Sequence, residues 1–318
     1  MILALAGGVG GAKLASGLAA LLPADELLVV VNTGDDFEHL GLRISPDLDT
    51  VMYWLAGRND AERGWGLAGE TWNFMDSLQT LGAPTWFRLG DRDLATHVER
   101  TRLLAAGEPL SAVTGYLCQR LGVTHRISPM TDGRVRTVIH TPDGQLEFQH
   151  YFVRLACRPP AIGIGFDGAA EAVPCPDFEA ALSRPDLDAI VICPSNPILS
   201  IQPILELRGV RDRIRAHRAP VIAVSPIIAG HAVKGPAAKL LQELRHESSA
   251  LEICRYYGDV VDGFVIDDSD RGLTDAIEAC GARVCVAPIL MKDSADRRRL
   301  AETVIGFAAA TAASAGKR

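Results

Sequence analysis

Six short apolar runs recur along the chain, separated by segments of helical pattern, and they limit the fold more than any other feature. Each run is continuous in Val, Ile, Leu and Ala, which is typical of strands buried on both faces of a parallel sheet. With helices expected at 236–247, 270–279 and 295–313, this order predicts an α/β fold with a doubly wound, mostly parallel sheet. The runs are 1–6, 27–34, 188–196, 220–226, 262–268 and 283–290.

The segment 51–160 has a different pattern. Residues 51–122 are mostly helical in character, and "DLATHVERTRLLAAG" is the clearest helix, with Asp93 as its N-cap and Gly107 at its end. Residues 123–160 contain an alternating stretch with a hairpin turn at Asp143-Gly144, so we expect an antiparallel excursion there. We therefore divide the chain into a core of 1–50 and 161–318 and an inserted helical and β-hairpin subdomain of 51–160.

The composition excludes several functional classes. The chain has 318 residues, 48% hydrophobic, and a net charge of −7, so it can bury a core but lacks the basic face that general nucleic-acid binding needs. None of the seven cysteines lies in a C-x-x-C pair, which indicates reduced thiols rather than a zinc site. Without a basic leader or an apolar stretch of about 20 residues, we expect a soluble cytoplasmic protein with no membrane contact.

The first apolar run ends in the glycine turn "GGVGGAK", which matches neither common phosphate loop. A dinucleotide fingerprint needs a third glycine where Lys13 stands, and a Walker A loop needs Gly before the lysine and Ser or Thr after it. Gly8, Gly10 and Gly11 still predict close approach of an anion to the backbone at a helix start. The alternative is a tight strand-to-helix turn with Lys13 facing solvent.

The second run leads into "NTGDDFEHLGLRISPDLDT", which starts at Asn32 and is rich in aspartates. Two carboxylates about 4 Å apart repel each other by about 1 kcal/mol in water and more inside a protein, so their grouping favours a bound cation. Hard oxygen ligands of this kind suit Mg²⁺. Alternatively, one of the four is a helix cap or a turn residue. The candidate metal ligands are Asp35, Asp36, Asp47 and Asp49.

Two further regions carry polar side chains after apolar segments. "FRLGDRDLATH" brings Arg88, Asp91 and Arg92 together ahead of a helix; a binding loop and a surface ion pair fit equally well. His97, one turn beyond Asp93, is expected to hydrogen-bond its neighbours. The post-strand loops "CPSNPILSIQPIL" and "VSPIIAGHAVKGPAAKL" have similar chemistry and favour a nucleotide or phosphate site. Their candidate residues are Ser195, Asn196, Ser225 and Lys234.

Together these motifs, in this order, make the chain resemble the 2-phospho-L-lactate transferase family from Met1 to about Met291. The resemblance implies a Rossmann-like core with an insert, a homodimer and a Mg²⁺-dependent reaction. The donor would be a guanosine diphosphate ester carrying a phospholactyl, phosphoenolpyruvyl or phosphoglyceryl group. The acceptor would be the ribityl hydroxyl of 7,8-didemethyl-8-hydroxy-5-deazariboflavin, a deazaflavin coenzyme precursor, and GMP would leave.

The resemblance also implies roles for particular residues. Asp49 and Arg88 look like acceptor contacts, and the aspartates of the second loop look like the metal site. In such a reaction Lys13, Arg92 or Lys234 could neutralise phosphate charge, and Asp35 or Asp49 could hold the metal or orient the attacking hydroxyl. We expect Asn196 and the Ser225 loop on the guanosine side.

Two other functions remain compatible with the sequence. One is an NAD(P)-dependent Rossmann oxidoreductase, although the fingerprint fails at Lys13. The other is a non-catalytic nucleotide-sugar-binding regulatory protein. The sequence leaves open which three-carbon acid the donor carries.

Overall fold

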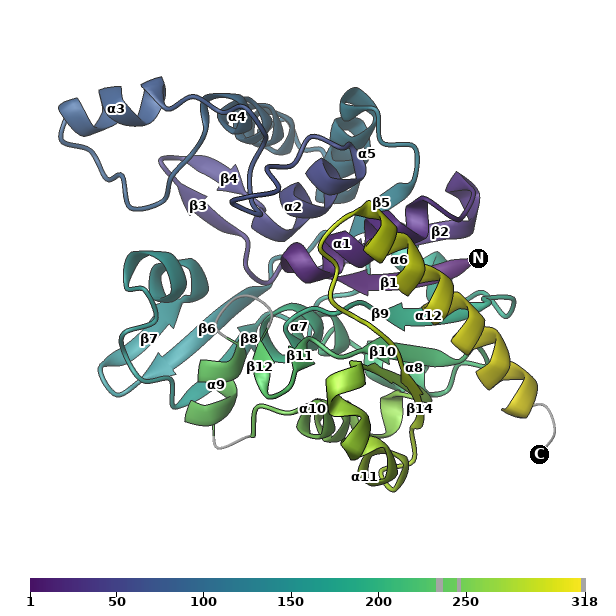
Figure 1. Ribbon diagram of the computed structural model, residues 1–318. Coiled ribbons are helices and arrows are strands. Elements are labelled where there is room, and N and C mark those ends of the chain that lie inside the picture. The colour runs from purple at the N-terminus through teal and green to yellow at the C-terminus, as the bar shows by residue number, and fades with distance from the viewer. Residues whose placement is uncertain (233–236, 245–246, 316–318) are drawn as a thin grey trace.

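The computed structural model describes residues 1–232, 237–244 and 247–315, and its centre is a wholly parallel sheet (Figure 1). The strand order is β14-β13-β10-β9-β1-β2-β5. The strands are β1 (Ile2–Ala6), β2 (Leu27–Val31), β5 (Arg126–Pro129), β9 (Ala189–Ile192), β10 (Val221–Val224), β13 (Gly263–Ile266) and β14 (Arg283–Val286). This confirms the predicted α/β class.

Helices cover both faces of the sheet, which explains why the strands are apolar throughout. In β1, Leu3 and Leu5 pack into one core while Ile2 and Ala4 pack into the other. Every residue of β1 is therefore removed from water. One face carries α1 (Gly8–Ala19), α2 (Pro46–Leu55), α5 (Leu110–Leu121) and α12 (Ser294–Ala315), and the other carries α6 (Pro176–Leu182), α7 (Gln202–Leu205), α8 (Val210–Arg215), α10 (Ala250–Tyr257) and α11 (Thr274–Glu278).

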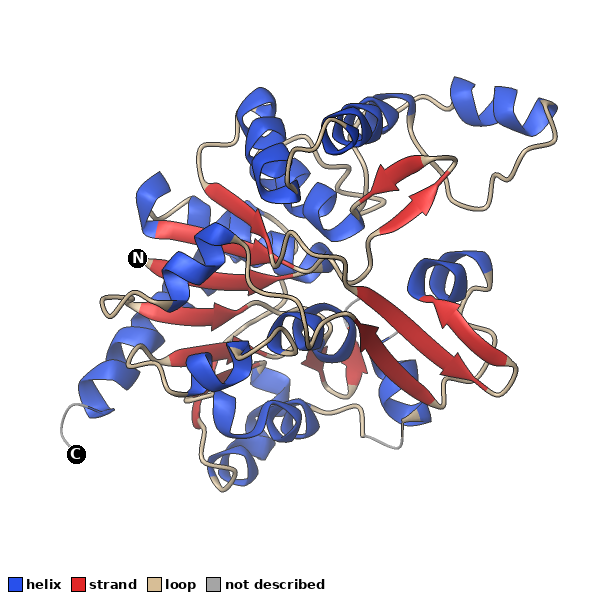
Figure 2. Cartoon of the chain, turned by 180° about the vertical axis from the view of Figure 1, so that it is seen from behind, coloured by secondary structure: helices blue, strands red, loops and turns tan. Residues whose placement is uncertain are grey.

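The remaining elements lie beyond the sheet, and Figure 2 shows the long antiparallel strands standing apart from it. Strands β6 (Arg136–Thr141), β7 (Gly144–Glu147) and β8 (Gly163–Asp167) form an antiparallel sheet, so the predicted hairpin before Gly144 is confirmed. The other elements are β3 (Phe37–His39), β4 (Leu42–Ile44), α3 (Asn73–Thr80), α4 (Asp91–Ala105), β11 (Ile227–Ile228), β12 (His231–Ala232) and α9 (Ala237–Glu243). In the described ranges, no helix is both long and apolar enough to cross a bilayer.

Three local predictions were wrong. Residues 126–129 do not belong to an antiparallel excursion, because β5 pairs in parallel with β2 at the sheet edge. Asp93 does not cap α4, because the helix begins at Asp91 with Gly90 as its N-cap. The helix expected at 270–279 is a 3₁₀ turn, Asp268–Leu273, followed by the short α11. The division into a core and an inserted subdomain stays a prediction.

The strand order places the functional region. From β1 the chain proceeds through β2 to β5 on one side and through β9 to β14 on the other. The order therefore reverses between β1 and β9. In open α/β sheets the loops at the carboxyl ends of the strands leave a crevice at such a point.

Candidate functional site

A cavity of about 610 Å³ opens at this switch point. Its lining includes Gly8 after β1, Asp35 after β2, Ser195 after β9 and Ser225 after β10, together with Asp49 from α2. Loops that are far apart in the sequence therefore meet in one cleft, as their positions after parallel strands predicted.

The glycine turn allows the loops of neighbouring strands to pack closely. Gly8 has φ +62°, which a larger residue adopts at a cost. A Cβ on Gly10 would lie 2.1 Å from the carbonyl oxygen of Pro194, and one on Gly11 would lie 2.5 Å from Oγ of Ser195. Two of the glycines are thus needed for contact with the β9 loop, a role that the sequence analysis did not predict for them.

The first backbone donors of the turn hold the walls of the cavity. The N–H of Gly7 donates to Oγ of Ser195 at 3.1 Å, and the N–H of Gly8 donates to Oδ1 of Asp47 at 2.8 Å. The N-terminus of α1, with Val9, also faces the cavity. A helix N-terminus in such a place favours an anionic ligand.

Lys13 lies on the cavity wall, so the alternative in which it faces solvent is wrong. Its ammonium donates to the carbonyl of Met291 at 2.8 Å and lies 5.8 Å from the ring centre of Trp54. The charge is thereby held beside the glycine turn.

Two buried carboxyl groups that line the cavity, those of Asp35 and Asp47, repel each other. Burial, and then the neighbouring Asp47 carboxylate, raise the pKa of Asp35 well above its usual value. Burial raises the pKa of Asp47 to about 6, although Asn32 donates to its Oδ2 at 3.0 Å. Oδ1 of Asp35 is buried without a hydrogen-bond partner. An unpartnered buried carboxylate oxygen beside a second carboxylate fits a hard divalent cation such as Mg²⁺.

Asp36 and Asn32 do not line the cavity. Asp36 accepts from the hydroxyl of Ser45 at 2.7 Å, and burial raises its pKa to about 7. Asn32 is fully buried, and besides bonding Asp47 it accepts from the N–H of Gly34 at 2.8 Å. The expectation that one aspartate caps a helix was wrong for α2, because its N-cap is Ser45.

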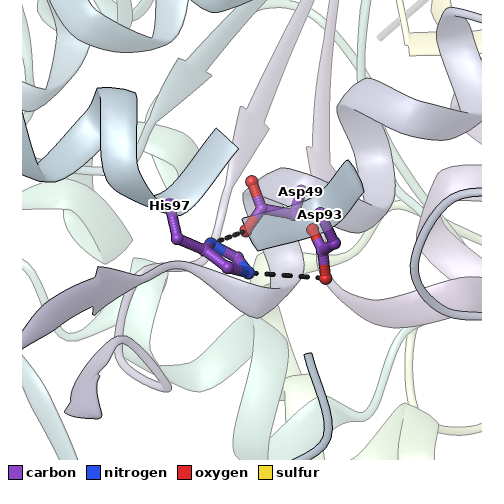
Figure 3. Close-up of side chains that lie close together, drawn as sticks. All are labelled: Asp49, Asp93 and His97. Atoms are coloured by element: carbon purple, nitrogen blue, oxygen red, sulfur yellow. Dashed lines mark ion pairs between the residues drawn. The ribbon is translucent and has the colours of Figure 1, made fainter. Parts of the chain in front are cut away.

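Asp49 belongs to a separate buried network between α2 and α4 (Figure 3). Both of its oxygens accept hydrogen bonds from the guanidinium of Arg100, which is only 1% exposed. The ring nitrogens of His97 lie 3.6 Å from Asp49 and 3.4 Å from Asp93. The phenol of Tyr53 donates to Asp93 at 2.6 Å. Burial first, and then Asp49 and Asp93, raise the pKa of Tyr53 well above its usual value, so that it remains a donor.

The acidic part of this network has the ligand types of a metal centre but does not need an ion. Ligand atoms of Asp49, Asp93 and His97 lie within 4.8 Å of one another, and no other such group occurs among the residues that the structure describes. Arg100 already supplies a positive charge against Asp49. The four predicted metal ligands therefore separate into the Asp35–Asp47 pair, the salt-bridged Asp49, and Asp36, which does not line the cavity.

In the segment 88–93, Arg88 lines the cavity, whereas Asp91 and Arg92 bond neighbouring segments of the chain. Arg88 lines the cavity and stacks on Trp72, 4.1 Å from the ring centre. Asp91 accepts from the side chains of Thr71 and Asn73, and these bonds hold its pKa at about 2. Arg92 donates to the carbonyl of Ala68 at 3.2 Å. Neither Asp91 nor Arg92 lines the cavity.

The polar residues of the last two loops line the cavity and also hold their own turns. Oδ1 of Asn196 accepts from the N–H groups of Ile198 and Leu199 at 3.0 and 3.1 Å. The hydroxyl of Ser225 donates to the carbonyl of Ile227 at 2.8 Å. Lys234 lies outside the described residues.

Sequence reasoning missed two parts of the site. One is Arg100, whose spacing from Asp93 and His97 puts all three on one helix face. The other is an aromatic wall of the cavity, which comes from segments about sixty residues apart. Its members are Trp86, Phe87, Phe148 and Phe152; Phe148 and Phe152 stack with ring centres 5.3 Å apart.

Comparison with known proteins gives a consistent result. Residues 2–288 match the family model described as 2-phospho-L-lactate transferase CofD. The chain is 43% identical to a phosphoenolpyruvate transferase of Kitasatospora aureofaciens, covering 96% of this chain and 97% of that protein. It is 39% identical to a 2-phospho-L-lactate transferase of Methanosarcina acetivorans, covering 95% and 97%. A crystal structure of a UPF0052 family member from Bacillus halodurans has a similar fold, with TM-score 0.61, 12% identity and coverage of 96% and 98%.

Proposed function

Because the chain belongs to the 2-phospho-L-lactate transferase family, we propose that it transfers a phosphoenolpyruvyl group from a guanosine diphosphate ester to the ribityl hydroxyl of 7,8-didemethyl-8-hydroxy-5-deazariboflavin. The family makes the protein a transferase of coenzyme biosynthesis, and neither an oxidoreductase nor a regulatory binder fits it. The choice of phosphoenolpyruvyl rests on the names of the relatives at 40–43% identity. The observation that carries the proposal is the meeting of the glycine turn, the Asp35–Asp47 pair and Asp49 in one cavity.

The donor's diphosphate fits the end of the cavity at the glycine turn. The N-terminus of α1 presents the positive end of a helix dipole to the cavity at Val9 and Gly10, next to the N–H groups that bond Ser195 and Asp47. Lys13 adds a fixed positive charge, and charge-assisted hydrogen bonds of this kind contribute about 1.5–3 kcal/mol each. Ser195, Asn196 and Ser225, which line the cavity from the neighbouring loops, would contact the guanosine.

Asp35 and Asp47 would hold Mg²⁺, with Asn32 orienting Asp47. When bound there, the ion would neutralise charge on the phosphate oxygens. The two carboxyl groups must lose their protons to bind it, and the raised pKa of each opposes that loss at low pH.

The acceptor fits against the aromatic wall of the cavity. The aromatic wall, including Trp86 and Phe148, offers flat surfaces to a tricyclic ring, and Arg88 lines the same cavity. Asp49 would accept a hydrogen bond from the ribityl hydroxyl and orient it, since the Arg100 salt bridge leaves lone pairs on its oxygens. The hydroxyl oxygen then bonds to the phosphorus that carries the three-carbon acid. The bond from that phosphorus to the bridging oxygen breaks, GMP leaves, and the hydroxyl proton passes to solvent.

A direct assay tests this function. The purified protein is mixed with Mg²⁺, the deazaflavin acceptor and either the enolpyruvyl or the lactyl guanosine diphosphate ester. We expect GMP by chromatography and, by mass spectrometry, a deazaflavin phosphodiester formed faster from the enolpyruvyl ester. Faster turnover of the lactyl ester would contradict the donor assignment, and no GMP from either ester would contradict the function. A solution mass of about twice 34.0 kDa would support the proposed homodimer.

A further inference from the structure

We infer that Arg100 is the positioning residue that holds the Asp49 carboxylate in its working orientation, an inference that rests on the proposed function. Arg100 does not line the cavity, whereas Asp49 does. Any effect of Arg100 on transfer must therefore pass through a neighbouring side chain.

The contacts of Arg100 point to Asp49 as that neighbour. Its two terminal nitrogens each donate to one oxygen of Asp49, in the fork arrangement that fixes a carboxylate plane. Arg100 is 1% exposed and Asp49 is 7% exposed. A buried ion pair is weak evidence for stability, because hydrophobic residues of similar volume often serve as well. The position of this ion pair, directly behind a carboxylate that lines the cavity, is better explained by the orientation that Arg100 gives to Asp49.

The helix that carries Arg100 is itself braced. Asp93, His97 and Arg100 lie on one face of α4, with His97 between the two carboxylates. Tyr53 ties Asp93 back to α2. The carboxylate of Glu70 accepts from the N–H groups of residues 92 and 93 at 2.8 Å each, so the first turn of α4 is also held. The guanidinium therefore has a fixed position relative to Asp49.

This arrangement leaves Asp49 able to contact a substrate. A carboxylate has about four lone-pair positions, and the fork of Arg100 uses two of them. Without the fork the Asp49 side chain could rotate, and a displacement of about 1 Å can lower the rate by on the order of 10²-fold.

A double-mutant cycle on turnover tests the inference. We expect Arg100→Gln to lower kcat about 10²-fold, and Arg100→Lys to recover part of the loss because it keeps the charge without the fork. Asp49→Asn should lower kcat by about 10²–10⁴-fold, and Asp49→Asn with Arg100→Gln should match Asp49→Asn alone within about twofold. Arg102→Gln, on the same helix but exposed and paired with Glu99, is the matched control and should keep full activity.

The outcomes separate positioning from a structural role. If the double variant loses the product of both single effects, Arg100 acts independently of Asp49 and the inference is wrong. Arg100→Gln leaves a buried carboxylate unpaired, so its folding is checked by circular dichroism; the double variant removes that charge and should melt closer to the wild type. If the wild-type protein transfers nothing, the proposed function fails, and a crystal structure of Arg100→Gln decides instead: a rotated Asp49 supports the inference, and an unmoved one overturns it.

Discussion

Replacing Asp36 with Asn should shift the stability of the metal-free protein in favour of the variant as the pH rises from about 4 to 7. Burial raises the pKa of Asp36 from 3.8 to about 7 in the folded chain, while the unfolded chain keeps the ordinary value. Between about pH 4 and 7 the unfolded side chain is ionised and the folded one is still protonated, so the wild type loses stability as the pH rises. The full shift corresponds to about 4 kcal/mol. The variant has no such group and avoids that loss.

The assay compares urea unfolding of the two proteins in EDTA, followed by tryptophan fluorescence at several values between pH 4 and 8. Oδ1 of Asp36 is buried without a partner, so the amide adds a cost of about 1–3 kcal/mol, but this cost does not change with pH. The result that matters is therefore the change in the stability difference with pH. Asp76→Asn, at an exposed position of α3, is the control for removing a surface charge. A difference that is flat with pH, or that shrinks as the pH rises, would refute the reasoning.

Three further changes probe other parts of the site. Gly10→Ala should destabilise the protein by about 1–3 kcal/mol and lower transfer, because the added Cβ would meet the Pro194 carbonyl oxygen at 2.1 Å; unchanged thermal unfolding would contradict the close packing. Asp35→Asn should weaken Mg²⁺ binding at least about tenfold by calorimetry, and wild-type affinity in the variant would remove Asp35 from the metal site. In the wild-type protein, excess EDTA should stop GMP release until Mg²⁺ is restored. Trp86→Ala should raise the KM for the deazaflavin acceptor several-fold with little change in the KM for the donor, since one aromatic contact contributes about 0.5–1.5 kcal/mol; an effect on the donor alone would place the acceptor elsewhere.

The parallel sheet could be predicted because burial on both faces leaves a direct mark on the sequence, as in β1 and β2. β5 was not predicted as a strand of this sheet because "RISP" is short and ends in Pro129. Only its pairing with β2 makes it a strand of the sheet. Nothing in the sequence indicated that Asp36 bonds Ser45 or that Asp49 pairs with Arg100. Adjacent aspartates such as Asp35 and Asp36 can face different surroundings, and sequence proximity cannot separate them.

In the site, too, the features set by the sheet topology could be predicted and those set by tertiary packing could not. Post-strand loops converged as the topology requires, which brought Gly8, Asp35 and Asn196 to one cavity. Arg100 was missed because an arginine in an amphipathic helix ordinarily lies on the solvent side, and only tertiary packing turned this one inward. The aromatic wall depends on the approach of Trp86 to the segment after β7, which no local pattern encodes.

A crystal structure with GMP and Mn²⁺ in place of Mg²⁺ tests the central claim most directly. We predict an anomalous peak between the carboxylates of Asp35 and Asp47, and a nucleotide phosphate at the N-terminus of α1 beside Lys13. A nucleotide bound away from the glycine turn, or a metal held by Asp49, Asp93 and His97 with Arg100 displaced, would contradict the account.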